Sequence, residues 1–232
     1  MEGLQNTKIK VLEPLSPEQS VELFFSKNSQ NMQRLDELTY FSDKLQDLNE
    51  ATIEAALEDK LDQKYMNLKP CSKKHSHTRA CTISYLSKHP IFDLYLAGHP
   101  LLIHLVSNSM RSLNFQSVTE LFRSLLDAVV ENSTSAKNDD DSFLLTIIDW
   151  LLSKLQYIDP KILDLLAVLS TVAMIPESHK FNIDSDFDKL ASELLLDNLE
   201  PRKTLKLLMQ SGFVGGGEIR GDAQYLVNPF IG

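Results

Sequence analysis

The chain has 232 residues, of which 43 % are apolar, and its formal net charge at neutral pH is −9. This apolar content is enough to bury the core of one large domain or two small ones, so we expect a globular protein. The negative charge argues against a protein that binds duplex nucleic acid, because such binding depends on Lys and Arg neutralising phosphates.

Targeting and membrane signals are weak throughout the sequence. The longest apolar run, residues 162–175, contains Asp164 and is too polar to cross a bilayer. Residues 1–6 lack the basic-then-apolar pattern of a signal peptide. Two cysteines are too few for a disulfide framework, which agrees with a reducing compartment. We therefore expect a cytoplasmic location.

The first fifteen residues predict a terminal strand and a linker. Residues 8–12 alternate polar and apolar side chains like a short strand, which must pair elsewhere because one strand cannot make a sheet. It either pairs with a C-terminal hairpin or belongs to a sheet whose other strands are missing from this polypeptide. Ser16, Pro17 and Gln19 then supply an N-cap, a first-turn proline and a capping-box side chain, so a helix begins there.

A polar stretch over residues 27–84 interrupts the helical domain predicted for residues 16–130. Its amphipathic segments, near 35–48 and 51–61, predict two surface helices, and we interpret the whole stretch as an insertion. The last part of this stretch, residues 71–81, predicts a solvated basic loop. Zinc is the alternative, although the spacing matches no common finger and the neighbouring basic residues disfavour a dication, so we expect no metal. The four side chains that could ligate zinc are Cys71, His75, His77 and Cys81.

The run Gly98-His99-Pro100-Leu101 predicts a helix end joined to a helix start. Gly98 can end a helix in a left-handed conformation, and Pro100 suits a first helical turn because it needs no amide donor there. Such a bend brings a flat proline ring and a free helix N-terminus together, which could cover a planar base or orient amides toward phosphate. An ordinary helix-helix corner is the alternative.

The rest of the chain predicts more helices and one hairpin. A capping box over residues 117–120 begins an amphipathic helix, residues 131–141 form a linker, and helices follow from Ser142 and from Asp159-Pro160. Residues 142–232 then predict a winged-helix-like domain: a helix from residue 184 or 185, a helix over 201–211, and a hairpin whose tip is the glycine-rich, turn-rich run 215–222. The expected fold is mainly α, a helical bundle followed by this winged-helix-like domain with its small C-terminal β-hairpin.

In this order, the segments resemble the helical and winged-helix half of NB-ARC or STAND-type signalling ATPases. The resemblance is carried by residues 11–24, which match the family's passage from strand to helix, by the Gly98-x-Pro100-Leu101 motif, and by residues 205–214 before the hairpin. It implies that Gly98, Pro100 and Leu101 lie at a nucleotide site with the proline against adenine. At the place of the family's phosphate-contacting histidine stands Asn228, which can donate a hydrogen bond but cannot become cationic.

The phosphate loop of that family is missing from this sequence, as are paired acids for magnesium after a strand. We therefore expect a non-catalytic regulatory module of a signal-transduction protein. ADP or ATP is the expected ligand, bound together with a nucleotide-binding core that is a missing N-terminal part or a separate partner. Alternatively, the chain is a degenerate relative that kept only the regulatory half. We expect no membrane partner.

Two further hypotheses remain open. One is a helical scaffold ending in a winged helix, as in PCI-type subunits, where the domain mediates contacts between proteins and binds no ligand. The other is winged-helix binding to DNA through Arg202, Lys203 and Lys206, which nearby Asp197, Glu200 and the overall acidity oppose.

Overall fold

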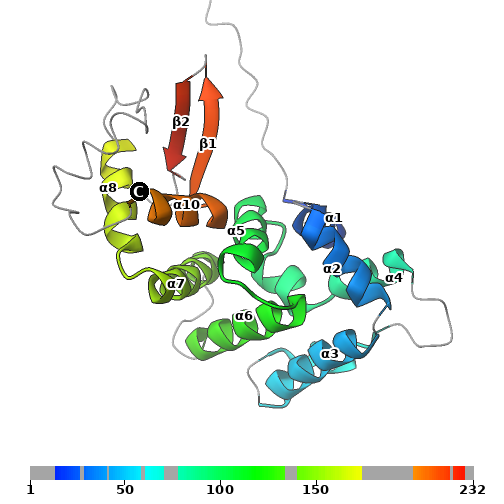
Figure 1. The fold of residues 1–232 in the computed structure, drawn as a ribbon. Coiled ribbons are helices and arrows are strands. Elements are labelled where there is room, and N and C mark those ends of the chain that lie inside the picture. Colours follow the sequence, from blue (N-terminus) through cyan, green and yellow to red (C-terminus); the bar gives the residue numbers. More distant parts are fainter. Residues whose placement is uncertain are drawn as a thin grey trace, which may run out of the picture.

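The protein is mainly α-helical, as predicted, and ends in a two-stranded antiparallel sheet (Figure 1). This arrangement comes from a computed structural model. The structure describes residues 14–26, 29–40, 42–58, 61–70, 78–133, 140–173, 201–219 and 222–227. The strand predicted for residues 8–12 and the helix predicted from residue 184 or 185 lie outside the described residues.

The described elements occur in the following chain order. The first half of the chain holds α1 (Pro17–Ser26), α2 (Ser29–Tyr40), α3 (Ser42–Leu57), the 3₁₀ helix η1 (Gln63–Asn67), α4 (Arg79–Leu86) and the π-helical turn η2 (Ile91–Tyr95). The second half holds α5 (Pro100–Ser112), α6 (Val118–Ser133), α7 (Asp140–Ile158), α8 (Ile162–Ala173), α10 (Pro201–Ser211), β1 (Val214–Ile219) and β2 (Asp222–Val227).

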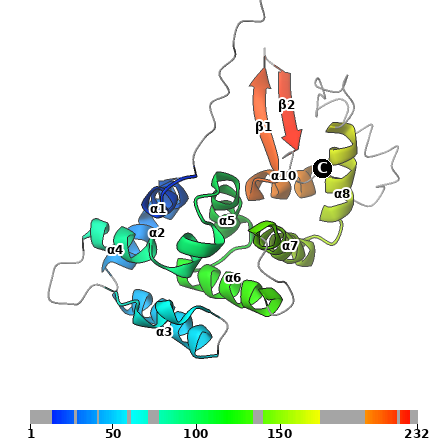
Figure 2. The ribbon, with the colours of Figure 1, turned by 180° about the vertical axis from the view of Figure 1, so that it is seen from behind.

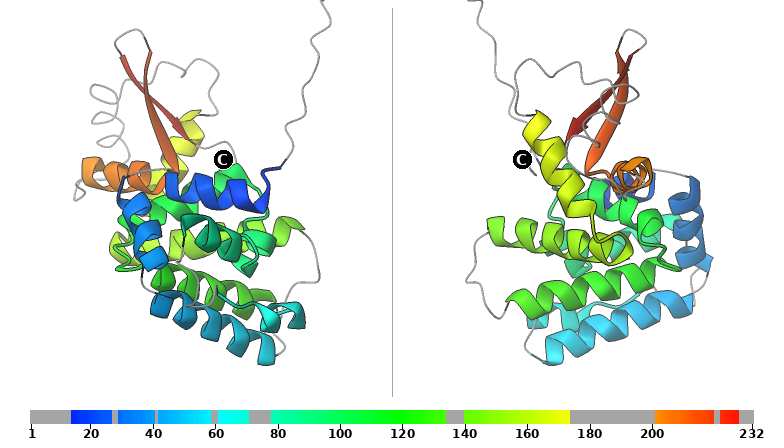
Figure 3. Two further views of the ribbon diagram at one scale, coloured as in Figure 1. Left: turned by 90° about the vertical axis from the view of Figure 1, so that its right-hand side faces the viewer. Right: turned by 60° about the vertical axis from the view of Figure 1, so that its left-hand side comes forward.

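Helix α5 lies at the centre of the arrangement and packs against α1, α7 and α10. Helix α6 packs against both α3 and α7. The hairpin stands on α10 at one end of the molecule, while α3 lies at the other end (Figures 1 and 2). Figure 3 shows the helices crossing in stacked layers, with the hairpin projecting beyond them.

The core is one hydrophobic cluster that runs from Val21 in α1 to Val214 in β1. Its centre is aromatic: the ring centroid of Phe24 lies 4.9 Å from that of Phe25, 5.7 Å from that of Phe92 and 5.5 Å from that of Phe122. All four side chains are fully buried. Edge-to-face and tilted contacts of this kind stabilise a core beyond the area they bury.

The predicted capping box of α1 is present, and that of α6 forms with its return hydrogen bond shifted by one residue to Gln116. At the start of α1, the Gln19 amide donates to Ser16 Oγ at 3.2 Å, and the Ser16 amide donates to Gln19 Oε1 at 2.9 Å. At the start of α6, the Glu120 amide donates to Ser117 Oγ at 3.1 Å, whereas Glu120 Oε2 accepts from the amide of Gln116 at 2.8 Å. These bonds satisfy amides that the helices leave unpaired, which is why both helices begin there.

Two helices form within residues 27–84, as predicted, but with other bounds: α2 ends at Tyr40 and α3 runs through the predicted break near residue 50. Their apolar faces are buried in the shared core through Leu35, Leu38, Leu45 and Leu48, and the interpretation of the stretch as an insertion stays a prediction. The stretch is polar because the opposite faces of both helices are exposed, and those faces dominate its composition.

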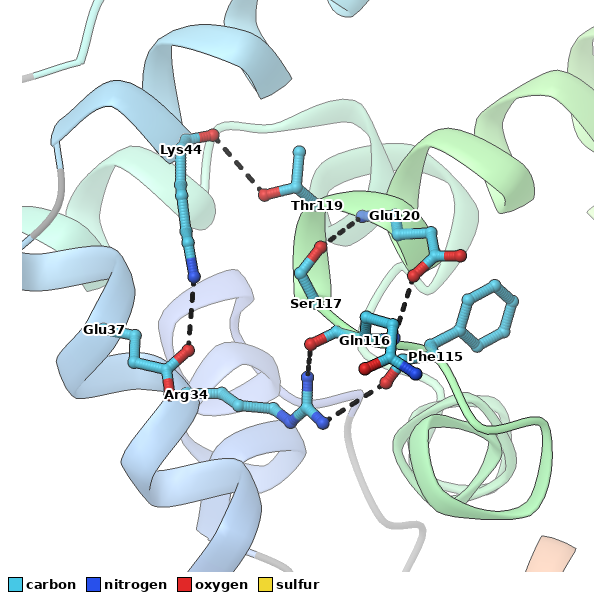
Figure 4. Close-up of polar contacts among 8 residues, drawn as sticks. All are labelled: Arg34, Glu37, Lys44, Phe115, Gln116, Ser117, Thr119 and Glu120. Atoms are coloured by element: carbon cyan, nitrogen blue, oxygen red, sulfur yellow. Dashed lines mark hydrogen bonds and ion pairs between the residues drawn. The ribbon is translucent and has the colours of Figure 1, made fainter.

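Polar contacts also connect α2 and α3 to α6 and to the loop that precedes it (Figure 4). The Arg34 guanidinium donates to the carbonyl oxygens of Gln116 at 2.7 Å and Phe115 at 3.2 Å. The Thr119 hydroxyl donates to the Lys44 carbonyl at 3.5 Å, and the Lys44 ammonium lies 3.3 Å from Glu37 Oε2. These contacts hold α2 and α3 in place as part of the bundle.

The predicted linker over residues 131–141 is too long. Helix α6 continues to Ser133 and α7 begins at Asp140, so helices occupy both ends of the predicted segment, and residues 134–139 lie outside the described residues. The packing also crosses this boundary, because α7 packs on α6 and α10 packs on α5. Residues from both predicted domains therefore share one core.

The predicted C-terminal hairpin is confirmed, but its first strand extends into the run 215–222 predicted as the turn. The register pairs Val214 with Val227 and Ile219 with Asp222, so the run 215–217 lies inside β1. Glycine disfavours a strand without forbidding it, and here the pairing with β2 outweighs the turn preference. Helix α10 packs on β1 and α8 on β2, which gives a helix-hairpin unit like the one predicted.

We expect Arg34→Ala to lower the free energy of unfolding by about 1–3 kcal/mol, because two carbonyls lose a charged donor. The matched control is Arg123→Ala, at an exposed arginine of α6 that makes no hydrogen bond or ion pair with other described residues, and it should change stability by less than about 0.5 kcal/mol. Urea denaturation measures both variants. Equal stability of the two would show that the Arg34 contacts do not hold α2 in place.

Candidate functional site

The corner before α5 is built from an unusual helical turn and a left-handed residue pair. The amide of Leu96 donates to the carbonyl of Ile91 at 2.7 Å, five residues earlier, so η2 is a π-helical turn and not the end of a regular α-helix. Ala97 and Gly98 follow with φ of 35° and 73°. The left-handed conformation predicted for Gly98 is therefore confirmed.

Gly98 is in direct contact with the chain that leads into α1. The amide of Leu15 donates to the carbonyl of Gly98 at 3.1 Å. A Cβ atom at position 98 would lie 2.2 Å from the Leu15 carbonyl oxygen and 2.9 Å from its amide nitrogen. Only glycine fits here, both for its positive φ and for this close backbone approach. The corner thereby joins the starts of α1 and α5.

The structure places the three predicted nucleotide-site residues of the corner together. Pro100 occupies the first turn of α5, as predicted, and its ring is exposed, whereas Leu101 is half-buried and Gly98 is buried. Asn228, the fourth predicted residue, lies outside the described residues. An exposed proline ring at a helix N-terminus is a surface that can cover an aromatic base.

Helix α5 also receives the C-terminal unit through a second left-handed glycine. Gly212, with φ of 88°, links α10 to β1. A Cβ atom there would lie 2.8 Å from Asn108 Nδ2 and 3.0 Å from His104 Cδ2. His104 and Asn108 are one turn apart on α5, and their side-chain nitrogens lie 3.1 Å apart. Close packing of the two parts therefore depends on the absence of a side chain at Gly212.

The predicted alternative zinc site is mostly outside the described residues, which include Cys81 but not Cys71, His75 or His77. Cys81 lies in the first turn of α4, where its amide donates to Thr78 Oγ1 at 3.4 Å. Among the described residues, no group of three His, Cys, Asp or Glu side chains could hold a metal ion. The zinc interpretation stays a prediction.

Sequence reasoning missed the buried histidine at the start of this corner. His89 is fully buried, and its ring stacks on Phe122 with centroids 6.1 Å apart. The Thr52 hydroxyl donates to the Leu48 carbonyl, so the His89 Nε2–H donates to Thr52 Oγ1 at 2.9 Å, while Nδ1 accepts from the Ile91 amide. Burial lowers the pKa of His89 to about 3, so the ring is neutral. In the sequence, the apolar residues Leu86 and Ile91 on either side of His89 are the signal that could have indicated its burial.

A second missed group anchors η2 from the other side. Asp93 Oδ2 accepts from the Tyr65 hydroxyl at 2.7 Å and from the Lys64 ammonium at 3.1 Å. Burial acts to raise the pKa of Asp93, but these two hydrogen bonds outweigh it and lower that pKa. The π-helical turn is thus held by η1 at Asp93 and by α3 at His89.

Comparisons with family models, curated proteins and solved structures find no match for this chain. Among the described residues, no helix combines the length and the apolar character that crossing a bilayer requires.

We expect Gly98→Ala to destabilise the fold by about 2–4 kcal/mol, because the new methyl group meets the Leu15 backbone and the left-handed conformation disfavours alanine. Ala97→Gly, at the exposed neighbouring position, should preserve or slightly raise stability because glycine relieves the same positive φ. Thermal and urea unfolding measure both. A Gly98→Ala protein as stable as the parent would rule out the tight corner.

We expect stability to fall with acidification through His89. Its pKa is lower in the folded protein than in the unfolded chain, so its contribution is complete above about pH 6.5 and is lost as the pH falls towards 3. The loss at about pH 5 is roughly 2 kcal/mol. Urea unfolding at about pH 7 and about pH 5 should show a smaller acid-induced loss for His89→Gln than for the parent. Equal losses would contradict a buried neutral histidine.

Proposed function

We propose that this chain is a non-catalytic regulatory module of a nucleotide-switched signalling protein, of the NB-ARC or STAND type. The observation that carries the proposal is a convergence at α5. Three segments distant in sequence support the family resemblance: the entry to α1, the Gly98-x-Pro100-Leu101 corner and the end of α10. The first meets the corner through the Leu15 to Gly98 hydrogen bond, and the third packs on α5 at Gly212.

In this proposal the corner contacts the base of the nucleotide. The exposed ring of Pro100 covers one face of adenine, Leu101 adds apolar contact beside it, and Gly98 holds the corner in shape. The phosphates are bound by a separate nucleotide-binding core, because this chain has no phosphate loop. Asn228 is the proposed second contact, as a hydrogen-bond donor. Because ADP and ATP differ only in their phosphates, the protein distinguishes them only when the core is in place. The proposed location of this switch is the cytoplasm.

The moving part in this proposal is the C-terminal unit of α8, α10 and the hairpin. Its contact with α5 is made at Gly212, against the polar side chains of His104 and Asn108. The α5–α10 contact is therefore the proposed closure surface.

A protein-assembly scaffold of the PCI type is the second candidate. The observation that favours it is the continuity of the hydrophobic core from α1 to β1, with the hairpin projecting from one end (Figure 3). Such a chain would contact other proteins and bind no nucleotide, so nucleotide binding discriminates between the two functions.

Calorimetric titration of the chain with ADP and ATP tests the proposal. Because this chain supplies the contact with the base and not the phosphate-binding core, we expect weak binding of ADP, and we expect Pro100→Ala to weaken it about fivefold further because the apolar cover of the base is lost. Pro160→Ala, at an exposed proline of the α7–α8 corner, should bind like the parent. Far-ultraviolet circular dichroism should show unchanged helicity in both variants. Absence of nucleotide binding, or equal affinity of parent and Pro100→Ala, would contradict the proposed site.

A further inference from the structure

The corner between α7 and α8 forms a groove against α10, and none of its described lining residues contacts the nucleotide or α5 in the proposal above. Its volume is about 530 Å³. Helix α8 rises from this corner alongside α10, and both helices pack together (Figure 1). The groove is lined by Ile158, Asp159, Pro160, Lys203, Thr204, Lys206, Leu207 and Gln210.

One face of α10 forms a wall of the groove. Lys203, Lys206, Leu207 and Gln210 follow the i, i+3, i+4, i+7 spacing that places residues on one side of a helix. Both lysines are exposed, whereas Leu207 and Gln210 are half-buried. This face of α10 thus combines positive charge at its edge with an apolar side chain lower in the groove.

The opposite wall is apolar and is fixed to α10 by one polar contact. Asp159 accepts from the Thr204 hydroxyl through Oδ2 at 2.5 Å and from the Lys161 amide through Oδ1 at 3.1 Å. Among the described lining residues, Asp159 is the only acidic one, and both of its carboxylate oxygens accept hydrogen bonds. Ile158 is 51 % exposed beside it, and Pro160 is exposed as well. The groove thus combines the apolar side chains of Ile158, Pro160 and Leu207 with two exposed lysines.

We infer that this groove is a docking site for an acidic protein segment that carries an apolar side chain. Charge complementarity decides the occupant: the edge is basic on a chain whose net charge is −9, so acidic carboxylates are drawn there and not to the surface in general. The apolar side chain contacts Ile158, Pro160 and Leu207.

A peptide fits these features better than DNA does. Two lysines neutralise few phosphates, and duplex binding depends on many such contacts. The apolar lining residues Ile158, Pro160 and Leu207 offer no hydrogen-bond donor to a phosphate, whereas a leucine or phenylalanine side chain gains free energy by leaving water against them. The inference is independent of nucleotide binding, so either proposal can fail alone.

The test is fluorescence anisotropy with a short labelled peptide rich in Asp and Glu around one central Leu. We expect saturable binding that weakens as salt rises. The double variant Lys203→Glu, Lys206→Glu should weaken binding about tenfold or more, and Ile158→Ser should weaken it as well. The matched control is Lys69→Glu, Lys88→Glu, which makes the same change of net charge at two exposed lysines outside the groove and should bind like the parent.

Three peptide results would overturn the inference. They are no binding by the parent, equal binding of an amide analogue with Asn and Gln in place of the acids, and equal loss in both double variants. Displacement of the peptide by duplex DNA at equal concentration would assign the groove to nucleic acid instead. Sedimentation of the parent and the Lys203→Glu, Lys206→Glu variant covers self-association: a dimer that the variant loses would assign the groove to a second copy and overturn the inference too.

Discussion

The close backbone approach of Leu15 to Gly98 is the constraint on which the architecture depends. It requires a residue without a side chain in a left-handed conformation, and it fixes where the chain enters α1 relative to the start of α5. The anchors of η2 support it, since His89 and Asp93 hold the turn that leads into Gly98. A rigid corner between two helices thereby results from interactions that are mostly made by backbone and buried polar groups.

Helix α5 then connects the rest of the fold to this corner. On one side, the Ser107 hydroxyl donates to the Phe24 carbonyl at 2.7 Å and Asn31 Nδ2 donates to Ser107 Oγ at 2.8 Å, so α1, α2 and α5 share a buried polar network. On another side, α5 accepts α10 at Gly212. The polar groups of the first contact are buried and hydrogen-bonded, which favours a permanent connection between α1, α2 and α5. The second contact, between α5 and α10, is the proposed closure surface.

The two proposed binding surfaces use different physical means. The corner offers an exposed proline ring whose position is set by backbone conformation, which suits a flat ligand. The groove beside α10 offers two exposed lysine side chains next to apolar ones, which suits an acidic segment. In the proposed regulatory module, the corner would bind the nucleotide and the groove would bind a protein segment, and the two sites share no described residue.

The sequence by itself determined the local features of this protein: the helix starts at Ser16 and Ser117, the left-handed Gly98, the first-turn Pro100 and the C-terminal hairpin. Each depends on residues within a few positions of one another. Tertiary structure decided that α2 and α3 join the core, that glycines 215–217 lie in a strand, that η2 is a π-helical turn and that His89 is neutral. It also brought Leu15 to Gly98, and Lys203 to the α7–α8 corner. Burial, strand pairing and proton affinity depend on partners distant in sequence, and no local pattern specifies them.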